Sequence, residues 1–413
     1  MSENYNPGDV DISDLTLEGK DYLQSFVSVM IQEHIMSPMV KGSIEINQSQ
    51  GAQAAFDGSQ DSTITFRTPE GEKRRYSLRT NSINNVTGDA AQRSRNFIVD
   101  LVSKHALINN ATPNFQKSFK NQQISQIIGS ILEEGLGLEI PFNISETRGL
   151  QGSDYQPMIL TQKSPLQHID DLRRMAVSSH NYDGFMLFSG IGQSGKEELN
   201  FKSIFEMIKG SSVANITNMS NFEMNNSLKS MMNNAIEIWL PEQTDALAKG
   251  STFSSGTTMF DMNTMTASVP ELAVGPARQQ LGSQTSLNPG QTSGFINEAF
   301  NGMPGTGNLI LEDTRRPESG RAETAPYTEA LMADIMQNSL TVKIPGNSNL
   351  KVGEIIDFDF RENTENFLNK DTKFYGKNLI AGITHYIGPI SDRPRYVTYL
   401  DLVNIQTYNG KIA

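Results

Sequence analysis

Short runs of alternating apolar and polar residues constrain this chain most, and they are clearest between residues 341 and 402. Val342 and Ile344 alternate there with polar neighbours. Pro345 and Gly346 then turn the chain before the alternation resumes. Side chains of a β-strand point alternately to the two faces of a sheet, so such runs predict strands with one buried face. We therefore predict a small antiparallel barrel or sheet at this end of the chain.

The same alternation fills the first 109 residues. Six groups of apolar residues repeat there at period two, with Gly or Pro between several of them: Leu15 and Leu17; Val27, Val29 and Ile31; Ile44 and Ile46; Ile64 and Phe66; Tyr76 and Leu78; Phe97, Val99 and Leu101. Short strands at this spacing are typical of barrels and sandwiches. The sequence predicts strand almost throughout this segment.

The period changes between residues 110 and 205. Residues 124–135 carry isoleucines and a leucine on one face of a predicted helix, and Pro165 opens a second helix. Two amphipathic helices need a sheet to cover, and the apolar residues of 185–201 predict a hairpin that supplies it. We expect an α+β segment here.

Residues 242–323 lose periodicity and are rich in Ser, Thr, Gly, Gln and Asn. This composition predicts a mobile or irregular insertion, and alternating segments on either side of it suggest that it interrupts a second barrel. The predicted fold class is α+β and β-rich. The predicted divisions are a first barrel at 1–109, an α+β domain at 110–205, a second barrel at 206–241 with 330–413, and an insertion at 242–329.

Charge and cysteine content exclude several classes of protein. The chain has 46 acidic and 34 basic residues, a formal net charge of -12, which argues against a surface that binds phosphate backbones or anionic lipid. It has no cysteine, so disulfides, thiolate metal sites and cysteine nucleophiles are excluded. No apolar run is long enough to span a bilayer and no signal peptide is apparent, which predicts a soluble protein made in a cytoplasm.

Residues 190–196 read Gly-Ile-Gly-Gln-Ser-Gly-Lys and satisfy two phosphate-loop patterns. Glu197 stands where a magnesium-binding Ser or Thr is needed, and Glu197 and Glu198 would put two negative charges at the phosphate site. A hairpin turn is therefore the preferred interpretation, and a nucleotide-binding enzyme is the less favoured one.

The remaining motifs predict no catalytic, cofactor-binding or metal-binding residue. His168 with Asp170 and Asp171 is the best candidate for a metal cluster, but these residues lie on the predicted second helix, where the aspartates suit a solvated face. For His385, on a predicted strand, we expect a structural hydrogen bond. The sequence indicates a protein that is not an enzyme and has no cofactor.

Several stretches resemble the central baseplate hub proteins of contractile-tailed bacteriophages, the T-even-like hub family, which is related to the N-terminal hub part of type VI secretion spike proteins. They are an opening "M-I-Q-E-H-I-M-S-P-M-V-K-G-S-I-E-I", a central "F-K-S-I", and the C-terminal patterns "P-G-N-x-x-L-x-x-G", "Y-G-x-x-L-I-x-G-I-x-H" and "Y-x-T-x-L-x-L". The positions that carry the family pattern are Glu33, Pro38, Gly42, Phe201, Ser203, Pro345, Gly346, Gly353, Gly376, Gly382 and His385.

The resemblance implies two small antiparallel tail-tube-like β-barrels with an α+β insert between them. It implies a homotrimeric ring of pseudo-six-fold symmetry that joins a hexameric tail tube to a trimeric spike and leaves a channel for DNA. The expected partners are further copies of the chain, the tube or tube-initiator protein, a spike or cell-wall hydrolase protein and the surrounding wedge proteins, with no specific nucleic acid binding. The expected location is the virion, in the tail baseplate. A hub or tube-like component of a related contractile injection system is the alternative.

Overall fold

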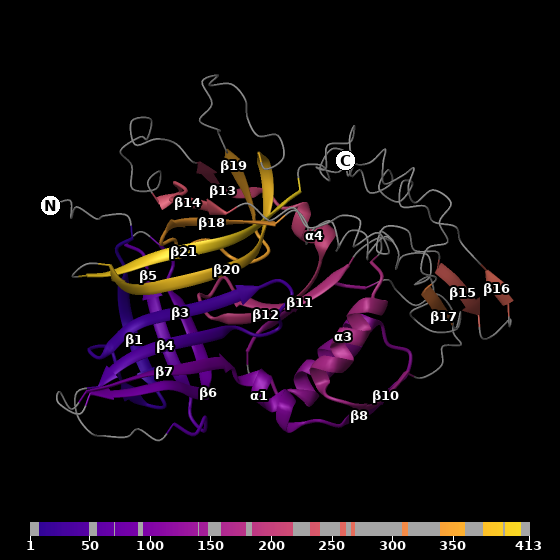
Figure 1. Ribbon diagram of the computed structural model, residues 1–413. Helices are drawn as coiled ribbons and strands as arrows, with labels where there is room; N and C mark the ends of the chain where they lie inside the picture. The colour runs from indigo at the N-terminus through magenta and orange to yellow at the C-terminus, as the bar shows by residue number, and fades with distance from the viewer. Residues whose placement is uncertain are drawn as a thin grey trace.

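The computed structural model is β-rich, with one large sheet and few helices (Figure 1). It describes residues 8–48, 56–69, 71–89, 94–138, 140–147, 158–178, 184–217, 232–239, 257–261, 266–268, 308–312, 339–359, 375–390 and 393–405. No helix in these ranges has the length and apolar character needed to cross a membrane.

The large sheet has 13 strands in the order β14-β18-β21-β20-β3-β4-β7-β6-β5-β1-β2, with β19 and then β13 branching from β20. Its strands are β1 (Asp11–Leu17), β2 (Lys20–Asp21), β3 (Phe26–His34), β4 (Lys41–Gln48), β5 (Ser62–Arg67), β6 (Arg74–Asp89), β7 (Ser94–Ser103), β13 (Ser212–Thr217), β14 (Glu237–Trp239), β18 (Ser339–Pro345), β19 (Ile355–Asp359), β20 (Gly376–Ile390) and β21 (Arg393–Asn404). The strands predicted in the first 109 residues and at the C-terminal end are confirmed.

Strands from opposite ends of the chain meet in this sheet. β3 and β20 pair antiparallel, with Ile31 opposite His385 and His34 opposite Gly382. The hairpin of β3 and β4 thereby lies beside the hairpin of β20 and β21, and one sheet continues from the N-terminal into the C-terminal part (Figure 1).

One pair in the sheet departs from the antiparallel prediction: β13 and β19 run parallel. Parallel neighbours require a long crossover connection, and the segment between these two strands is long enough to provide one. Among the described strands, no pairing closes either part of the sheet into a barrel. The two barrels and the domain divisions therefore stay predictions.

Buried apolar residues form three clusters. The first lies within β1 to β7 and includes Leu15, Ile44 and Phe66, and the C-terminal residues Ile387 and Tyr396 join it. The second lies mainly in the C-terminal strands and also contains Ile35 and several residues of 186–208, and the third lies in the middle segment. Because Tyr396 packs into the N-terminal cluster, the two halves of the large sheet share a buried boundary.

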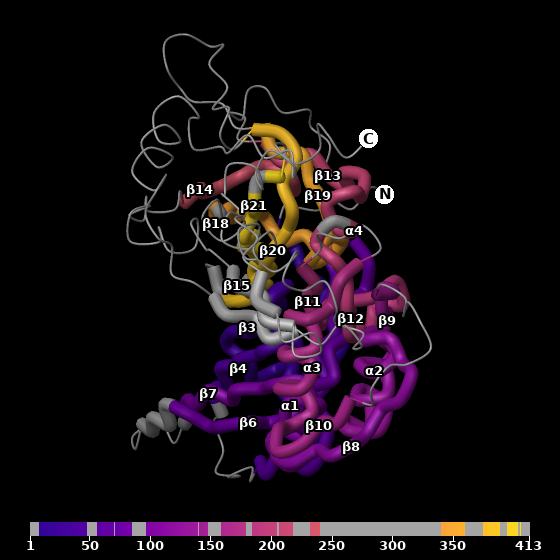
Figure 2. Tube along the Cα trace, turned by 90° about the vertical axis from the view of Figure 1, so that its right-hand side faces the viewer, coloured from indigo at the N-terminus to yellow at the C-terminus, as the bar shows by residue number. Residues whose placement is uncertain are grey.

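The middle segment carries the helices α1 (Lys104–Ala111), α2 (Ile124–Ser130), a π-helical turn η1 (Ile131–Gly135), α3 (Pro165–Met175) and α4 (Ile204–Ile208). The two predicted helices are confirmed, and so is the hairpin, formed by β11 (Phe185–Ile191) and β12 (Glu197–Ser203). β9 (Phe142–Ile144) runs parallel to β12, and β8 (Phe115–Phe119) pairs with β10 (Met158–Lys163); neither was predicted. Figure 2 shows these elements together beside the large sheet.

The prediction of strand up to residue 109 is wrong at its end, because α1 begins at Lys104. His105 and Ala106 are both buried. Two successive buried side chains suit a helix, whereas a strand with one buried face would expose one of them.

The two segments that flank the predicted insertion pair with each other, since β14 lies antiparallel to β18 with Ile238 opposite Val342. Within the insertion, β15 (Thr257–Asp261), β16 (Thr266–Ser268) and β17 (Asn308–Glu312) form a three-stranded sheet. For these three strands the prediction of irregular structure is wrong. The sequence did not reveal them because their residues lack the clear periodicity by which the other strands were predicted. The rest of 242–329 lies outside the described residues.

Candidate functional site

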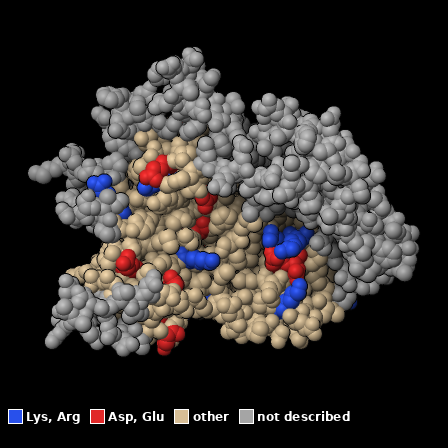
Figure 3. Space-filling view, in the orientation of Figure 1, with Lys and Arg blue, Asp and Glu red and all other residues tan. Residues whose placement is uncertain are grey.

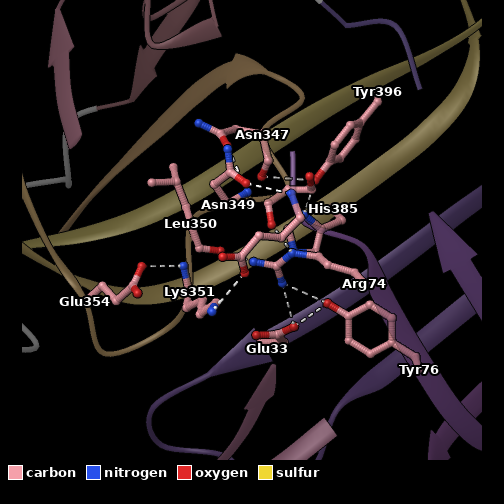
Figure 4. Close-up of polar contacts among 12 residues, drawn as sticks. Glu33, Arg74, Tyr76, Asn347, Asn349, Leu350, Lys351, Glu354, His385 and Tyr396 are labelled. Carbon is pink, nitrogen blue, oxygen red and sulfur yellow. Dashed lines mark hydrogen bonds and ion pairs between the residues drawn. The ribbon is translucent and has the colours of Figure 1, made fainter. Parts of the chain in front are cut away.

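A buried polar cluster joins the N-terminal and C-terminal parts of the large sheet (Figure 4). Arg74 is its centre, and the side chains of Arg74 and Glu33 are both fully buried. Arg74 and Tyr76 lie on β6 and Glu33 on β3, whereas their C-terminal partners lie in the turn after β18.

Arg74 uses all three of its guanidinium nitrogens. Nε donates to the carbonyl of Ser348 at 2.8 Å, and Nη2 donates to the carbonyl of Leu350. Nη1 donates to Glu33 Oε1 at 3.2 Å and to the Tyr76 hydroxyl at 3.0 Å. A planar, always charged group with several fixed donors suits this role, because it can bind two carbonyls and a carboxylate at once. One side chain thereby fastens the C-terminal turn to the N-terminal strands.

Charge compensation makes the buried cation tolerable. Burial alone works against the charged form of Arg74, but Tyr76 and Glu33 outweigh it and raise its pKa. Burial raises the pKa of Glu33, although Arg74 and the hydrogen bond from Tyr76 oppose this. Burial also raises the pKa of Tyr76, which keeps its hydroxyl protonated as a donor. Glu33 Oε2 is buried and has no hydrogen-bond partner.

A second set of polar contacts extends the junction toward its edge. The Thr68 and Ser348 hydroxyls lie 2.9 Å apart in the buried region. At the surface, Lys351 Nζ lies 3.0 Å from Glu72 Oε2, and its backbone N–H donates to Glu354 Oε2 at 2.9 Å. Figure 4 shows Lys351 and Glu354 beside the Arg74 cluster. The turn after β18 is thus bound to the N-terminal strands at several points.

His385 completes the junction on the β20 side. Its Nδ1 lies 2.7 Å from the Tyr396 hydroxyl, so the predicted structural hydrogen bond is confirmed. Burial lowers the pKa of His385, and nearby Arg74 lowers it further, so the ring is neutral. Tyr396 also donates to the Asn347 carbonyl at 3.2 Å. A Cβ added to Gly346 would lie 2.0 Å from Tyr396 Cδ1, which explains why glycine stands in this turn.

The structure brings some of the family-pattern positions together and leaves others apart. Glu33, Gly346 and His385 lie in the junction, and Pro345 enters it at the end of β18. Gly353, with φ of +84°, donates its N–H to the Ile380 carbonyl at 2.9 Å.

The other family-pattern positions make local contacts. Gly376 has φ of +101° and begins β20, and Gly382 has no room for a side chain beside Asp401 and His34. The Pro38 carbonyl contacts His105 Nε2, and Gly42 lies under Leu78 and Leu101. Phe201 stacks on Phe185 with ring centroids 4.8 Å apart, and the Ser203 hydroxyl accepts from the Glu206 N–H at 3.0 Å in α4. Whether these positions serve the family's function stays a prediction.

Sequence reasoning missed Arg74, Ser348 and Tyr396. A charged run such as Glu72-Lys73-Arg74-Arg75 is typical of a solvated face, and only Arg74 in it is buried. The sequence did contain a signal that Arg74 is buried. In a strand, Arg74, Tyr76 and Leu78 point to the same face of the sheet, and Tyr76 and Leu78 were predicted to lie on the buried face.

Residues 190–196 form the predicted hairpin turn and not a phosphate loop. The Gly192 N–H donates to the Lys196 carbonyl at 2.9 Å, and Gly195 has φ of +72°. Glu197 begins β12, so no helix follows the glycines and the nucleotide-binding hypothesis is wrong for this stretch.

Glu197 is buried next to the turn. Its Oε1 accepts from the hydroxyls of Ser103 at 2.5 Å and Ser189 at 3.2 Å. Burial raises the pKa of Glu197 to about 7, although both hydroxyls act to lower it. The carboxyl therefore holds the hairpin against the end of β7 through its hydrogen bonds with these two serine hydroxyls.

The His168 cluster is structural. His168 Nε2 lies 3.1 Å from the Phe115 carbonyl, and Asp170 binds Arg173 and Arg174 while Asp171 binds Lys163. Figure 3 shows acidic and basic side chains gathered over α3, which confirms the solvated face. Among the described residues, no group of three or more potential ligands could hold a metal ion.

Comparison with known proteins identifies the fold. No family model matches the sequence, and no curated protein matches it. The 43 kDa tail protein of prophage MuSo2 from Shewanella oneidensis is similar in structure, with a TM-score of 0.55 at 11% identity over 96% of this chain and 98% of that one. A tail protein from Neisseria meningitidis MC58 has a TM-score of 0.54 at 10% identity over 97% and 98%. The chain thus has, over nearly its whole length, the fold of these tail proteins.

Proposed function

We propose that this chain is a structural baseplate hub of a contractile phage tail. Three copies form a ring of pseudo-six-fold symmetry that joins the hexameric tail tube to the trimeric spike and leaves a central channel for DNA. Its work is assembly and the transmission of force, with no catalytic turnover.

The proposal rests mainly on one observation: the N-terminal and C-terminal parts of the large sheet join edge to edge within one chain. The β3–β4 hairpin and the β20–β21 hairpin lie side by side, and β3 pairs directly with β20. A ring of three chains with two comparable units each presents six units, which suits a six-fold tube on one face and a three-fold spike on the other. The fold shared with two tail proteins over almost their entire length supports the same reading.

The proposal includes the division of the chain. Residues 1–109 form a first tube-like barrel, and 206–241 with 330–413 form the second. Residues 110–205 form an α+β domain outside them, and 242–329 is an insertion in the second barrel. Each of the three apolar clusters draws most of its residues from the first, the middle or the last part of the chain, which supports this division.

The Arg74 junction then has a mechanical purpose. A ring that transmits force needs its two units held in a fixed relation, and a buried guanidinium that binds Glu33 and two carbonyls across the boundary provides this. Buried polar networks that link two parts of a fold favour one arrangement of those parts. The proposed partners are further copies of the chain, the tube or tube-initiator protein, the spike protein and the wedge proteins, in the baseplate of the virion.

Electron microscopy of the purified chain tests the proposal. The expected class averages are three-fold rings with a central hole, divided into six similar lobes. Compact particles without a hole would contradict it. The same ring would serve a related contractile injection machine, and its presence in purified phage tails would assign it to a phage.

A further inference from the structure

A buried carboxyl group links the hairpin of β11 and β12 to the N-terminal strands. Glu197, the first residue of β12, is 5% exposed, and its Oε1 accepts from the Ser103 hydroxyl at the end of β7. The Ser189 hydroxyl on β11 donates to the same oxygen. Both of these partners are neutral. When Glu197 is ionised, its charge therefore lies buried with hydroxyls as its donors, which is costly.

Two backbone hydrogen bonds support the same contact. The Ser189 N–H donates to the Ser37 carbonyl at 3.3 Å, and the Arg75 N–H donates to the Gly195 carbonyl at 2.8 Å. Ile191 packs into the N-terminal apolar cluster. Backbone amides and an isoleucine do not titrate near neutral pH. Of these interactions, only the one made by Glu197 changes with pH.

A second buried carboxyl lies against β11. Glu33 Oε2 has no hydrogen-bond partner among the described residues, and a Cβ added to Gly190 would lie 3.4 Å from it. The charge of Glu197 raises the pKa of Glu33, so the two carboxyls repel each other when both are ionised. Arg74 pairs with Glu33 through Oε1 at 3.2 Å. One buried guanidinium thus faces two buried carboxyls, which favours the state in which Glu197 keeps its proton.

The charged groups of the surrounding elements do not offset this. They are Glu33 on β3, Arg74 and Arg75 on β6, Lys104 and His105 in α1, and Lys196 and Glu198 on β12. Burial lowers the pKa of His105, so its ring is neutral where Glu197 titrates. Arg75 and Lys196 are exposed. Among the described residues, the only groups that act to lower the pKa of Glu197 are the two serine hydroxyls, and burial outweighs them.

We propose that Glu197 makes the hairpin contact sensitive to pH: the hairpin binds the N-terminal strands when Glu197 carries a proton and separates from them when it does not. The ionised carboxylate gains hydration by leaving Ser103, and its departure removes the repulsion on Glu33. The Ser189–Ser37 and Arg75–Gly195 hydrogen bonds then break together. This switch goes beyond the proposed hub role, because every group in it belongs to one chain and it operates in a single copy.

Hydrogen exchange of the full chain, read at single amides between pH 5.5 and 8.5 and divided by the intrinsic rate at each pH, tests the switch. The reporters are the Ser189 and Arg75 N–H groups, because both are donated across the contact. The pKa of Glu197 is about 7 in the closed state and takes its ordinary value of 4.5 in the open state, so the open fraction should rise about 30-fold over this range. The Gly192 N–H should stay protected, since its acceptor Lys196 lies within the hairpin.

Glu197→Gln is the decisive variant. It keeps a carbonyl oxygen that accepts from the two hydroxyls but does not titrate, so protection at Ser189 and Arg75 should be the same at every pH. The matched control Glu198→Gln, at the next residue of β12, should show the wild-type rise. A rise of equal size in Glu197→Gln, or no rise in the wild type, would overturn the proposal. Equal loss of protection at Gly192 would overturn it as well, because the hairpin would then unfold and not separate as a unit.

Discussion

Removal of the Arg74 guanidinium tests whether the buried junction holds the two parts of the sheet together. In Arg74→Met the aliphatic stem is kept, but Glu33 Oε1 loses a charged donor and the Ser348 and Leu350 carbonyls lose theirs. Deleting one partner of a buried ion pair typically costs about 3 to 5 kcal/mol. The high pKa of Glu33 allows that carboxyl to take up a proton, so we expect the lower end, about 3 kcal/mol of unfolding free energy.

Urea unfolding followed by the fluorescence of Trp239 measures this loss, because Trp239 is the only tryptophan and lies in the C-terminal part of the sheet. The matched control is Arg75→Met, an exposed arginine on the same strand, which should change stability by less than about 0.5 kcal/mol. The double variant Arg74→Met with Glu33→Met should be more stable than Arg74→Met alone, since it removes the orphaned carboxyl. Equal losses in Arg74→Met and Arg75→Met would refute the reasoning.

Two further predictions concern packing and pH. Glu197→Gln should remove a pH dependence of stability. The pKa of Glu197 is about 7 in the folded state and lower in the unfolded state, so the unfolding free energy of the wild type should fall by about 3 kcal/mol as pH rises from about 4.5 to 7, at about 1.4 kcal/mol per pKa unit. Thermal melts at several pH values measure this slope, and the control Glu198→Gln should keep it. A Glu197→Gln protein that keeps the wild-type slope would contradict this. Gly346→Ala should destabilise the fold by about 1 to 3 kcal/mol, because the added Cβ meets the buried Tyr396 ring. The control Gly129→Ala in α2 should be neutral or stabilising. Equal melting temperatures of the two variants would contradict the prediction and show that the Tyr396 ring can move aside.

Local patterns in the sequence were sufficient to predict most strands and the helices α2 and α3 of the middle segment. Period-two alternation found β3 through its buried Val29 and Ile31, and the Pro at the start of α3 marked that helix. Alternation shows which face of a strand is buried, but it does not specify which strand lies alongside. Alternation therefore could not predict that β3 pairs with β20 or that β13 and β19 pair in parallel.

The candidate site was predicted only in part for the same reason. Glu33, Gly346 and His385 were found through the family pattern, but nothing local indicated that they meet. Arg74 was missed because a lone arginine in a charged run resembles a surface residue, and its partners at Ser348 and Leu350 come from the far end of the chain. Long-range polar contacts of this kind depend on tertiary structure.

The native mass of the purified chain, measured by light scattering over a range of concentrations, tests the trimeric hub most directly. One chain has a mass of 45.6 kDa, so the ring predicts a species near three times that mass, about 137 kDa. A protein that stays at the mass of one chain or two at every concentration would contradict the proposal that this chain alone forms the ring.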